Sequence, residues 1–156
     1  MNGAQPALFP EPVGDDLPED TCGKTSPYTG LLGEYFFQYW LLREMGLKSQ
    51  RIDGSFDYGV EVGSRYLRVE VKSTHTEDRH RYCFSASRVR EENVVDRQRV
   101  RRSTALTPED CDIIALVAHD LEKIAFCLPP GDSSKVIARS VFLDQNNGRR
   151  TWEYCL

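Results

Sequence analysis

The feature that most constrains the fold is an alternation of apolar and polar residues between Tyr58 and Lys72, interrupted by Gly63-Ser64. Side chains of a β-strand point to opposite faces with period two, so the alternation predicts a strand on each side of this dipeptide. Glycine at the first position of a two-residue loop suits a type II′ turn, which matches the twist of the strands it joins. The stretch is therefore predicted to be an antiparallel hairpin.

Counting outward from the loop sets the register of this hairpin, with Val62 opposite Arg65 and Tyr58 opposite Val69. One face then carries most of the apolar side chains and is predicted to join the core: Tyr58, Val60, Val62, Leu67, Val69 and Val71. The other face is largely polar and holds Asp57, Gly59, Glu61, Tyr66, Arg68, Glu70 and Lys72.

The same register places Asp57 directly opposite Glu70. Like charges in opposed positions are destabilising, because their Cβ atoms lie only about 4.5–5.5 Å apart. Lys72 and Arg68 could neutralise Glu70 in a surface salt-bridge cluster. Alternatively, the two carboxylates bind a divalent cation such as Mg²⁺, with Gly59 leaving room for a ligand. The hairpin alone leaves both explanations open, and removal of Asp57 is expected to relieve the repulsion and stabilise the metal-free protein.

The remaining elements are read from periodicity and turn residues. Apolar residues at helical spacing predict a helix from Gly30 to Met45, capped by Thr29 and ended by Gly46, with Glu34 and Gln38 one turn apart on a more polar flank. Further strands are predicted at 49–52, 81–87, 112–120 and 123–129, the last two forming a second hairpin, with short edge strands at 140–144 and 151–156. The basic stretch 90–103 is either helical or a long loop. The predicted fold class is α/β, with a central mixed sheet flanked by helices.

The length and composition indicate one soluble domain. The chain has 156 residues, of which 40% are apolar and 28% charged, and it has no run long enough for a membrane helix. Residues 1–25 are predicted to be a flexible acidic extension rich in proline and glycine, and residues 26–156 a single domain. The start of the chain lacks the features of a secretory signal, and the five cysteines form no CxxC pair, so reduced thiols and a cytoplasmic location are expected.

Positive charge is concentrated in one part of the chain. The net charge is −4, but residues 1–23 hold five acids and no base, which leaves 19 acids against 20 bases elsewhere. Within that remainder, eight arginines fall in 24 residues: Arg79, Arg81, Arg88, Arg90, Arg97, Arg99, Arg101 and Arg102. On composition alone this is more typical of a solvated surface than of a polyanion-binding segment.

The order of these residues resembles the PD-(D/E)XK nuclease superfamily. Asp57 is followed on the next strand by Glu70-Val71-Lys72, and the preceding helix "GEYFFQYWLLREMG" carries Glu34. Phe56 stands before Asp57 where the motif that names the superfamily has proline. The later strand pair, "CDIIALVAHDLEKIAFCLP", looks like that of the intron-associated, homing and resolvase-like branches. The resemblance covers about residues 29 to 143 and implies an α-β-β-β-α-β core.

The resemblance also implies an activity, namely divalent-metal-dependent hydrolysis of DNA phosphodiesters by an endonuclease. Asp57, Glu70 and the backbone carbonyl of Val71 would bind Mg²⁺, or Mn²⁺ in its place, with Glu34 contributing through water or a second metal. Lys72 would orient or deprotonate the attacking water. This context raises the expectation that DNA is contacted by Arg68, Thr74, Arg79, Arg81, Arg88, Arg90, Arg97 and Arg101.

Two other functions compete with the nuclease. The chain could be a nucleic-acid-binding module on the same fold that cuts nothing, although such a module has no need for opposed acids. It could also be an interaction or immunity domain of a mobile element, with the acids serving as surface charge. Cutting both strands of a duplex would call for a homodimer or a higher homo-oligomer, by symmetry.

Overall fold

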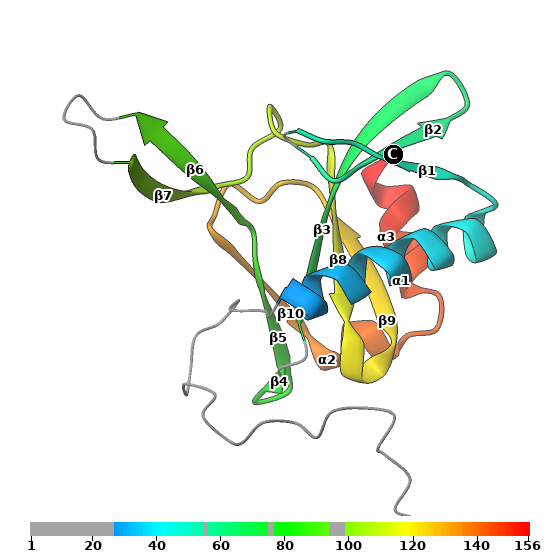
Figure 1. The fold of residues 1–156 in the computed structure, drawn as a ribbon. Helices are drawn as coiled ribbons and strands as arrows, with labels where there is room; N and C mark the ends of the chain where they lie inside the picture. The colour runs from blue at the N-terminus through cyan, green and yellow to red at the C-terminus, as the bar shows by residue number, and fades with distance from the viewer. Residues whose placement is uncertain (1–26, 55, 75–76, 94–98) are drawn as a thin grey trace, which may run out of the picture.

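The computed structural model describes residues 27–54, 56–74, 77–93 and 99–156, excluding the side chains of residues 27, 77–78 and 90–102. A five-stranded mixed sheet forms its centre, in the order β1 (Ser49–Arg51), β2 (Tyr58–Val62), β3 (Arg65–Thr74), β8 (Ile113–Ala118) and β9 (Lys123–Cys127) (Figure 1). Strands β3 and β8 are parallel, and the other neighbours are antiparallel. The predicted fold class, a mixed sheet flanked by helices, is confirmed.

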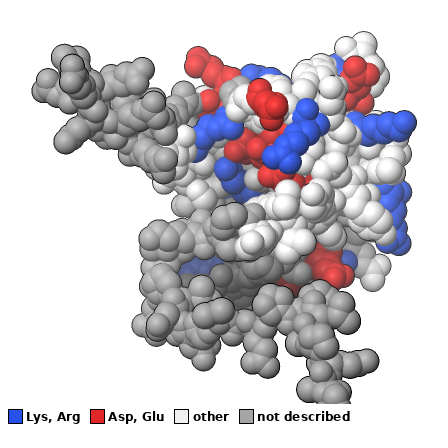
Figure 2. All heavy atoms as spheres, viewed as in Figure 1, with Lys and Arg blue, Asp and Glu red and all other residues white. Residues whose placement is uncertain are grey.

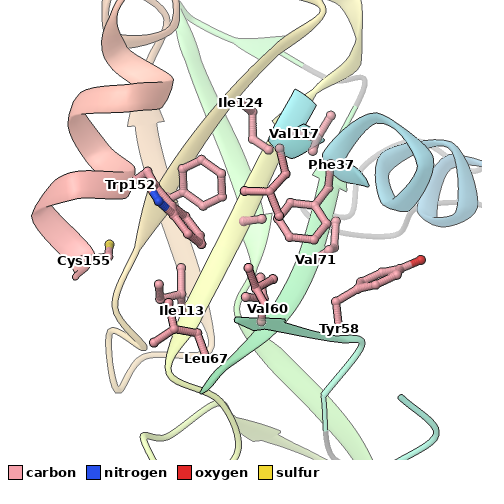
Figure 3. Packing of buried hydrophobic residues seen from close by; sticks show 14 residues of the cluster. Phe37, Tyr58, Val60, Leu67, Val71, Ile113, Val117, Ile124, Trp152 and Cys155 are labelled. Atoms are coloured by element: carbon pink, nitrogen blue, oxygen red, sulfur yellow. The ribbon is translucent and has the colours of Figure 1, made fainter. Parts of the chain in front are cut away.

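The sheet separates two hydrophobic clusters. Helices α1 (Pro27–Met45) and α3 (Asn147–Cys155) cover one face, where Phe37 and Trp152 pack on the apolar side of the β2–β3 hairpin (Figure 3). The other face packs against the small sheet β10-β5-β4, formed by Ser134–Ala138, Arg81–Ser85 and Glu77–Asp78, and against helix α2 (Arg139–Leu143). Strand β8 is buried on both faces, as its continuous apolar sequence predicts.

The predicted hairpin register is confirmed over the whole of β2. The pairs run from Val62 opposite Arg65 to Tyr58 opposite Val69, and Gly63 has the positive φ of +60° that the two-residue loop requires. Helix α1 begins three residues earlier than predicted and ends as predicted, because Gly46 takes a φ of +65° and its N–H bonds the carbonyl of Leu42.

The basic stretch after β5 differs from both sequence interpretations. The described residues form a hairpin, β6 (Ser87–Asn93) and β7 (Arg99–Ala105), paired over seven positions and joined to neither of the other sheets. This hairpin takes the place of the helix expected between the third and fourth core strands. The stretch lacks apolar residues at helical spacing, which a helix would need in order to pack against the core. Pairing between two strands satisfies the backbone hydrogen bonds and requires no such apolar face.

The C-terminal segments are also corrected. Residues 140–144 and 151–156 were expected to be edge strands, but they lie in the helices α2 and α3. Gly148, Trp152 and Cys155 are buried at helical spacing against the sheet, and this packing decides the conformation of a segment too short for periodicity alone. A 3₁₀ turn (His119–Leu121) joins β8 to β9.

The cysteines depart in one respect from the expectation of reduced thiols. Cys111, Cys127 and Cys155 are free, but Cys83 on β5 is disulfide-bonded. Sequence spacing could not show this, because it depends on which segments the fold brings together. None of the described helices has the length and apolar character needed to cross a lipid bilayer.

Candidate active site

The predicted acids and lysine line one cavity of about 200 Å³, together with residues from α1 and β5. Its walls are formed by Gly30, Glu34, Asp57, Glu70, Val71, Lys72, Ser73 and Ser85. The cavity lies beside the first residue of β2, where β3 continues past its pairing with β2. The tertiary structure therefore brings together Glu34 from the helix and the Asp57, Glu70 and Lys72 of the hairpin, as the sequence predicted.

Asp57 forms hydrogen bonds with the backbone of β3 next to the last residue pair that joins β3 to β2. Its Oδ2 accepts a hydrogen bond from the Val71 N–H at 2.8 Å, and its own N–H donates to the Val69 carbonyl at 3.1 Å. The N–H and C=O of a strand residue point to the same side of the strand, so the Val71 carbonyl faces this open edge as well. The carboxylate of Asp57 thus has a structural role, and the expectation that its removal stabilises the protein neglects this bond.

Glu70 is a buried carboxylate with half of its hydrogen-bonding capacity unused. The residue is 3% exposed, and Oε1 accepts a hydrogen bond from Lys72 Nζ at 2.8 Å, whereas Oε2 is buried without a partner. Burial raises the pKa of Glu70, and the charge of Asp57 adds to the increase, while Lys72 and Arg88 oppose it. An unpartnered buried carboxylate oxygen is unfavourable unless another group binds it.

Glu34 is held at the cavity by a second set of contacts. Its Oε2 accepts a hydrogen bond from the Tyr58 hydroxyl at 3.0 Å and lies 3.5 Å from the guanidinium of Arg51. The Tyr58 oxygen in turn accepts a hydrogen bond from Gln38 Nε2 at 2.9 Å. Burial is the main cause that raises the pKa of Tyr58 to about 12, followed by its bond to Glu34, so the hydroxyl remains a donor.

Sequence reasoning did not assign functional roles to Tyr58, Gln38 and Arg51. Gln38 was visible one helical turn from Glu34, and Tyr58 directly follows Asp57, but its alternation assigned it to the core. The assignment is correct for the ring, which packs against Phe37 in the core. Tyrosine can combine a buried ring with a hydroxyl that reaches a polar site, and periodicity does not show which partner the hydroxyl finds.

Arg68 does not neutralise Glu70, contrary to the salt-bridge interpretation of the hairpin. Its guanidinium binds the Asp112 carboxylate at 2.9 Å and the backbone carbonyls of Pro108 and Glu109, both at 2.7 Å. The hydrogen bonds that Arg68 donates to Asp112 hold the pKa of that carboxylate below its usual range. Asp112 precedes β8, the strand that pairs with β3, and its distance in sequence from Arg68 hid the pairing. Lys72 alone therefore forms an ion pair with Glu70 among the described residues.

The described residues that were predicted to contact DNA come from several elements. Thr74 is buried on β3, while Arg79 and Arg81 are exposed at the β4–β5 turn. Arg88 donates to the carbonyl of Gly54 at 2.9 Å and lies close enough to Glu70 to lower its pKa. The side chains of Arg90, Arg97 and Arg101 lie outside the described residues. In Figure 1 the β6–β7 hairpin extends away from the central sheet, and Figure 2 shows charged side chains of both signs gathered above α1.

The donor set fits one divalent cation with few protein ligands. No three His, Cys, Asp or Glu side chains in the described parts of the chain converge into a metal cage. Asp57 and Glu70 nevertheless share a cavity, Glu70 Oε2 needs a partner, and the Val71 backbone faces the same edge. Mg²⁺ is typically bound by one or two carboxylates and retains several waters, so this set suits it better than it suits a fully protein-ligated ion.

Comparison with known proteins extends the fold argument. No family profile and no curated protein sequence matches this chain. Among solved structures, the chain is similar to a bacterial homing endonuclease, I-Ssp6803I, with a TM-score of 0.57 and 20% sequence identity. The similarity covers 73% of this chain and 78% of that one. At this identity the likeness concerns the fold, which is nuclease-like, and membership of the PD-(D/E)XK superfamily stays a prediction.

Proposed function

We propose that this chain is a divalent-metal-dependent endonuclease that hydrolyses phosphodiester bonds in DNA. The observation that carries the proposal is the state of Glu70, whose buried Oε2 lacks a partner beside Asp57 and Lys72. A purely structural ion pair would leave this atom permanently unsatisfied. The structural likeness to a homing endonuclease supports DNA as the substrate.

The acids, the lysine and the Val71 backbone of the cavity each have a role in this proposal. Asp57, Glu70 and the Val71 carbonyl hold the cation, and Glu34 contributes through a bound water. The metal supplies a nucleophile at neutral pH and a counter-charge for the phosphate. Lys72 Nζ, held by Glu70 Oε1 at 2.8 Å, orients the attacking water and places a compact cation beside the scissile phosphate.

DNA binding is assigned to arginines outside the lining of this cavity. Arg79 and Arg81 at the β4–β5 turn, together with Arg88 near Glu70, would contact backbone phosphates. Arg90, Arg97 and Arg101 are retained as predicted DNA contacts. Arg68 is a weaker candidate than the sequence implied, because its guanidinium is engaged by Asp112 and two carbonyls.

The deciding experiment is cleavage of supercoiled plasmid and branched DNA with Mg²⁺, with Mn²⁺ and with EDTA. We expect metal-dependent cutting by the native chain, lost in Lys72→Ala and kept in Lys48→Ala, which removes an exposed lysine away from the cavity. Normal cutting by Lys72→Ala would overturn the site assignment. If the native chain cuts nothing, calorimetry with Mn²⁺ decides, because a chain that binds no metal belongs to the class of non-catalytic nucleic-acid-binding or interaction modules.

A further inference from the structure

Helix α1 carries an apolar stripe that the rest of the described chain leaves largely exposed, although Arg43 donates a hydrogen bond to the Tyr39 hydroxyl at 2.7 Å. It consists of Tyr28, Leu32, Tyr35, Tyr39 and Leu42, which are 78%, 53%, 58%, 57% and 55% exposed, respectively. Successive members are four, three, four and three residues apart, which is the spacing that aligns side chains along a helix–helix seam. We call this set the outer stripe of α1.

The outer stripe lies on the side of α1 that faces away from the sheet. Phe37 and Leu41, which pack into the core, lie on the opposite side of the helix. The surface over α1 in Figure 2 is largely free of charged side chains. Apolar residues therefore occupy two opposite sides of α1, and the described residues bury only one of the two.

The stripe is large enough to matter energetically. A tyrosine ring buries about 150–250 Å², so the five side chains at these exposures, with the neighbouring Leu31, present roughly 600 Å². A monomer rarely exposes contiguous apolar patches beyond a few hundred Å². A standard interface buries about 800 Å² per partner, and the stripe alone would supply about three-quarters of that area.

We propose that the outer stripe is the contact between two copies of this chain, with the two α1 helices packed antiparallel about a two-fold axis near Tyr35. A two-fold interface uses the same patch on both subunits, and this stripe is complementary to itself when reversed. Antiparallel packing pairs Tyr28 with Leu42 and Leu32 with Tyr39 of the other copy. Parallel packing would instead place tyrosine on tyrosine and leucine on leucine, which fits large and small side chains less well.

The orientation of the two cavities follows from the same axis. Glu34 lies about 120° around the helix from the centre of the stripe, on the flank that lines the cavity. A two-fold axis relating antiparallel helices runs perpendicular to both, so corresponding flanks remain on one side of the pair. Both cavities would then face one duplex, one for each strand. This consequence rests on the proposed nuclease function, whereas the contact itself does not.

The first test measures mass, without DNA or metal. Sedimentation velocity of the native chain at micromolar concentration should show a dimer, and Tyr35→Glu should halve the mass by placing two carboxylates together at the axis. Tyr154→Glu, which changes an 83% exposed tyrosine on α3, should remain a dimer. A monomeric native chain would overturn the proposal, whether residues 1–26, another protein or solvent then covers the stripe.

The second test measures orientation by oxidative cross-linking. Tyr35→Cys should cross-link to its own copy, and a mixture of Tyr28→Cys with Leu42→Cys should form a heterodimeric product. All variants carry Cys127→Ser as well, because Cys127 is free and only half-buried, whereas the free Cys111 and Cys155 are buried. Tyr28→Cys alone should not cross-link in this background, nor should the background chain itself. Efficient cross-linking of Tyr28→Cys to itself would indicate parallel helices and overturn the antiparallel arrangement. Neither test depends on DNA cleavage, so failure of this proposal is distinguishable from failure of the nuclease.

Discussion

The hydroxyl of Tyr58 donates a hydrogen bond to Glu34 at 3.0 Å and so links the strand that follows Asp57 to the helix that covers the sheet. The ring of Tyr58 is fixed in the core against Phe37, which leaves its hydroxyl little freedom. The position of Glu34 at the cavity therefore depends on a core residue, and core packing and site geometry are coupled at this point.

Replacing Tyr58 with phenylalanine tests this coupling. Tyr58→Phe should keep the fold and lower cleavage about 10-fold, because the loss of one hydrogen bond to a charged group costs roughly 1.5 kcal/mol. The Mg²⁺ concentration for half-maximal activity should rise as well. In a Glu34→Gln background the same change should have little further effect, since the two residues act as a pair.

Tyr82→Phe is the matched control, because it removes another buried tyrosine hydroxyl, one that donates to Asp120. It should alter stability without changing the metal dependence. If Tyr58→Phe and Tyr82→Phe behaved alike in cleavage and in metal response, Tyr58 would have no positioning role. The nuclease proposal would be unaffected, because it is tested by cleavage with the native chain.

Asp57 is predicted to combine metal binding with support of the β3 backbone. Asp57→Ala leaves the Val71 N–H without its 2.8 Å acceptor, which should lower the free energy of unfolding of the metal-free protein by about 1 kcal/mol. Asp57→Asn keeps an acceptor oxygen and should be closer to the native stability, yet both variants should lose Mn²⁺ binding measured by calorimetry. Stabilisation by Asp57→Ala would instead favour the repulsion between opposed carboxylates as the dominant effect.

A thermal-shift measurement tests the metal site at Glu70. Mn²⁺ should raise the melting temperature of the native chain, because a ligand that binds only the folded state stabilises it. Glu70→Gln should abolish this response, since a neutral amide cannot replace the buried carboxylate. Glu61→Gln, at an exposed position on β2, should respond as the native chain does. An unchanged response in Glu70→Gln would place any bound metal elsewhere.

The Arg68–Asp112 pair should make a pH-dependent contribution to stability. Because the pKa of Asp112 is lowered in the folded state, its contribution is present above the unfolded-state pKa of about 4 and is lost as pH falls through the lower folded-state value. Asp112→Asn should therefore lower unfolding free energy at neutral pH by about 1 kcal/mol, discounted for partial exposure. The difference from the native chain should shrink on acidification in urea titrations.

Asp132→Asn, at an exposed position between β9 and β10, serves as the control for this pH effect. It should show no comparable loss at neutral pH. A deficit of Asp112→Asn that stayed constant from neutral to strongly acidic pH would mean that the pair contributes through packing and neutral hydrogen bonds, and not through the charge of Asp112.

The sequence alone determined the part of this protein that local periodicity controls. Alternation around Gly63-Ser64 gave the hairpin register, the core face and the placement of Asp57, Glu70 and Lys72 on one strand pair. Strand geometry has a fixed period of two, so these relationships follow from counting along a short segment. The end of α1 at Gly46 was predicted for a similar reason, because a positive φ is a local requirement.

Only the tertiary structure decided the relationships between distant segments. Arg68 binds Asp112 because β3 and β8 are parallel neighbours, and Tyr58 reaches Glu34 because α1 crosses the apolar face of the hairpin. Residues 139–143 and 147–155 form helices where their large side chains pack against the sheet. These outcomes depend on the relative free energies of alternative packings, and each free energy is a sum over many contacts between segments far apart in the chain. The sequence of a single segment therefore does not show which packing is favoured.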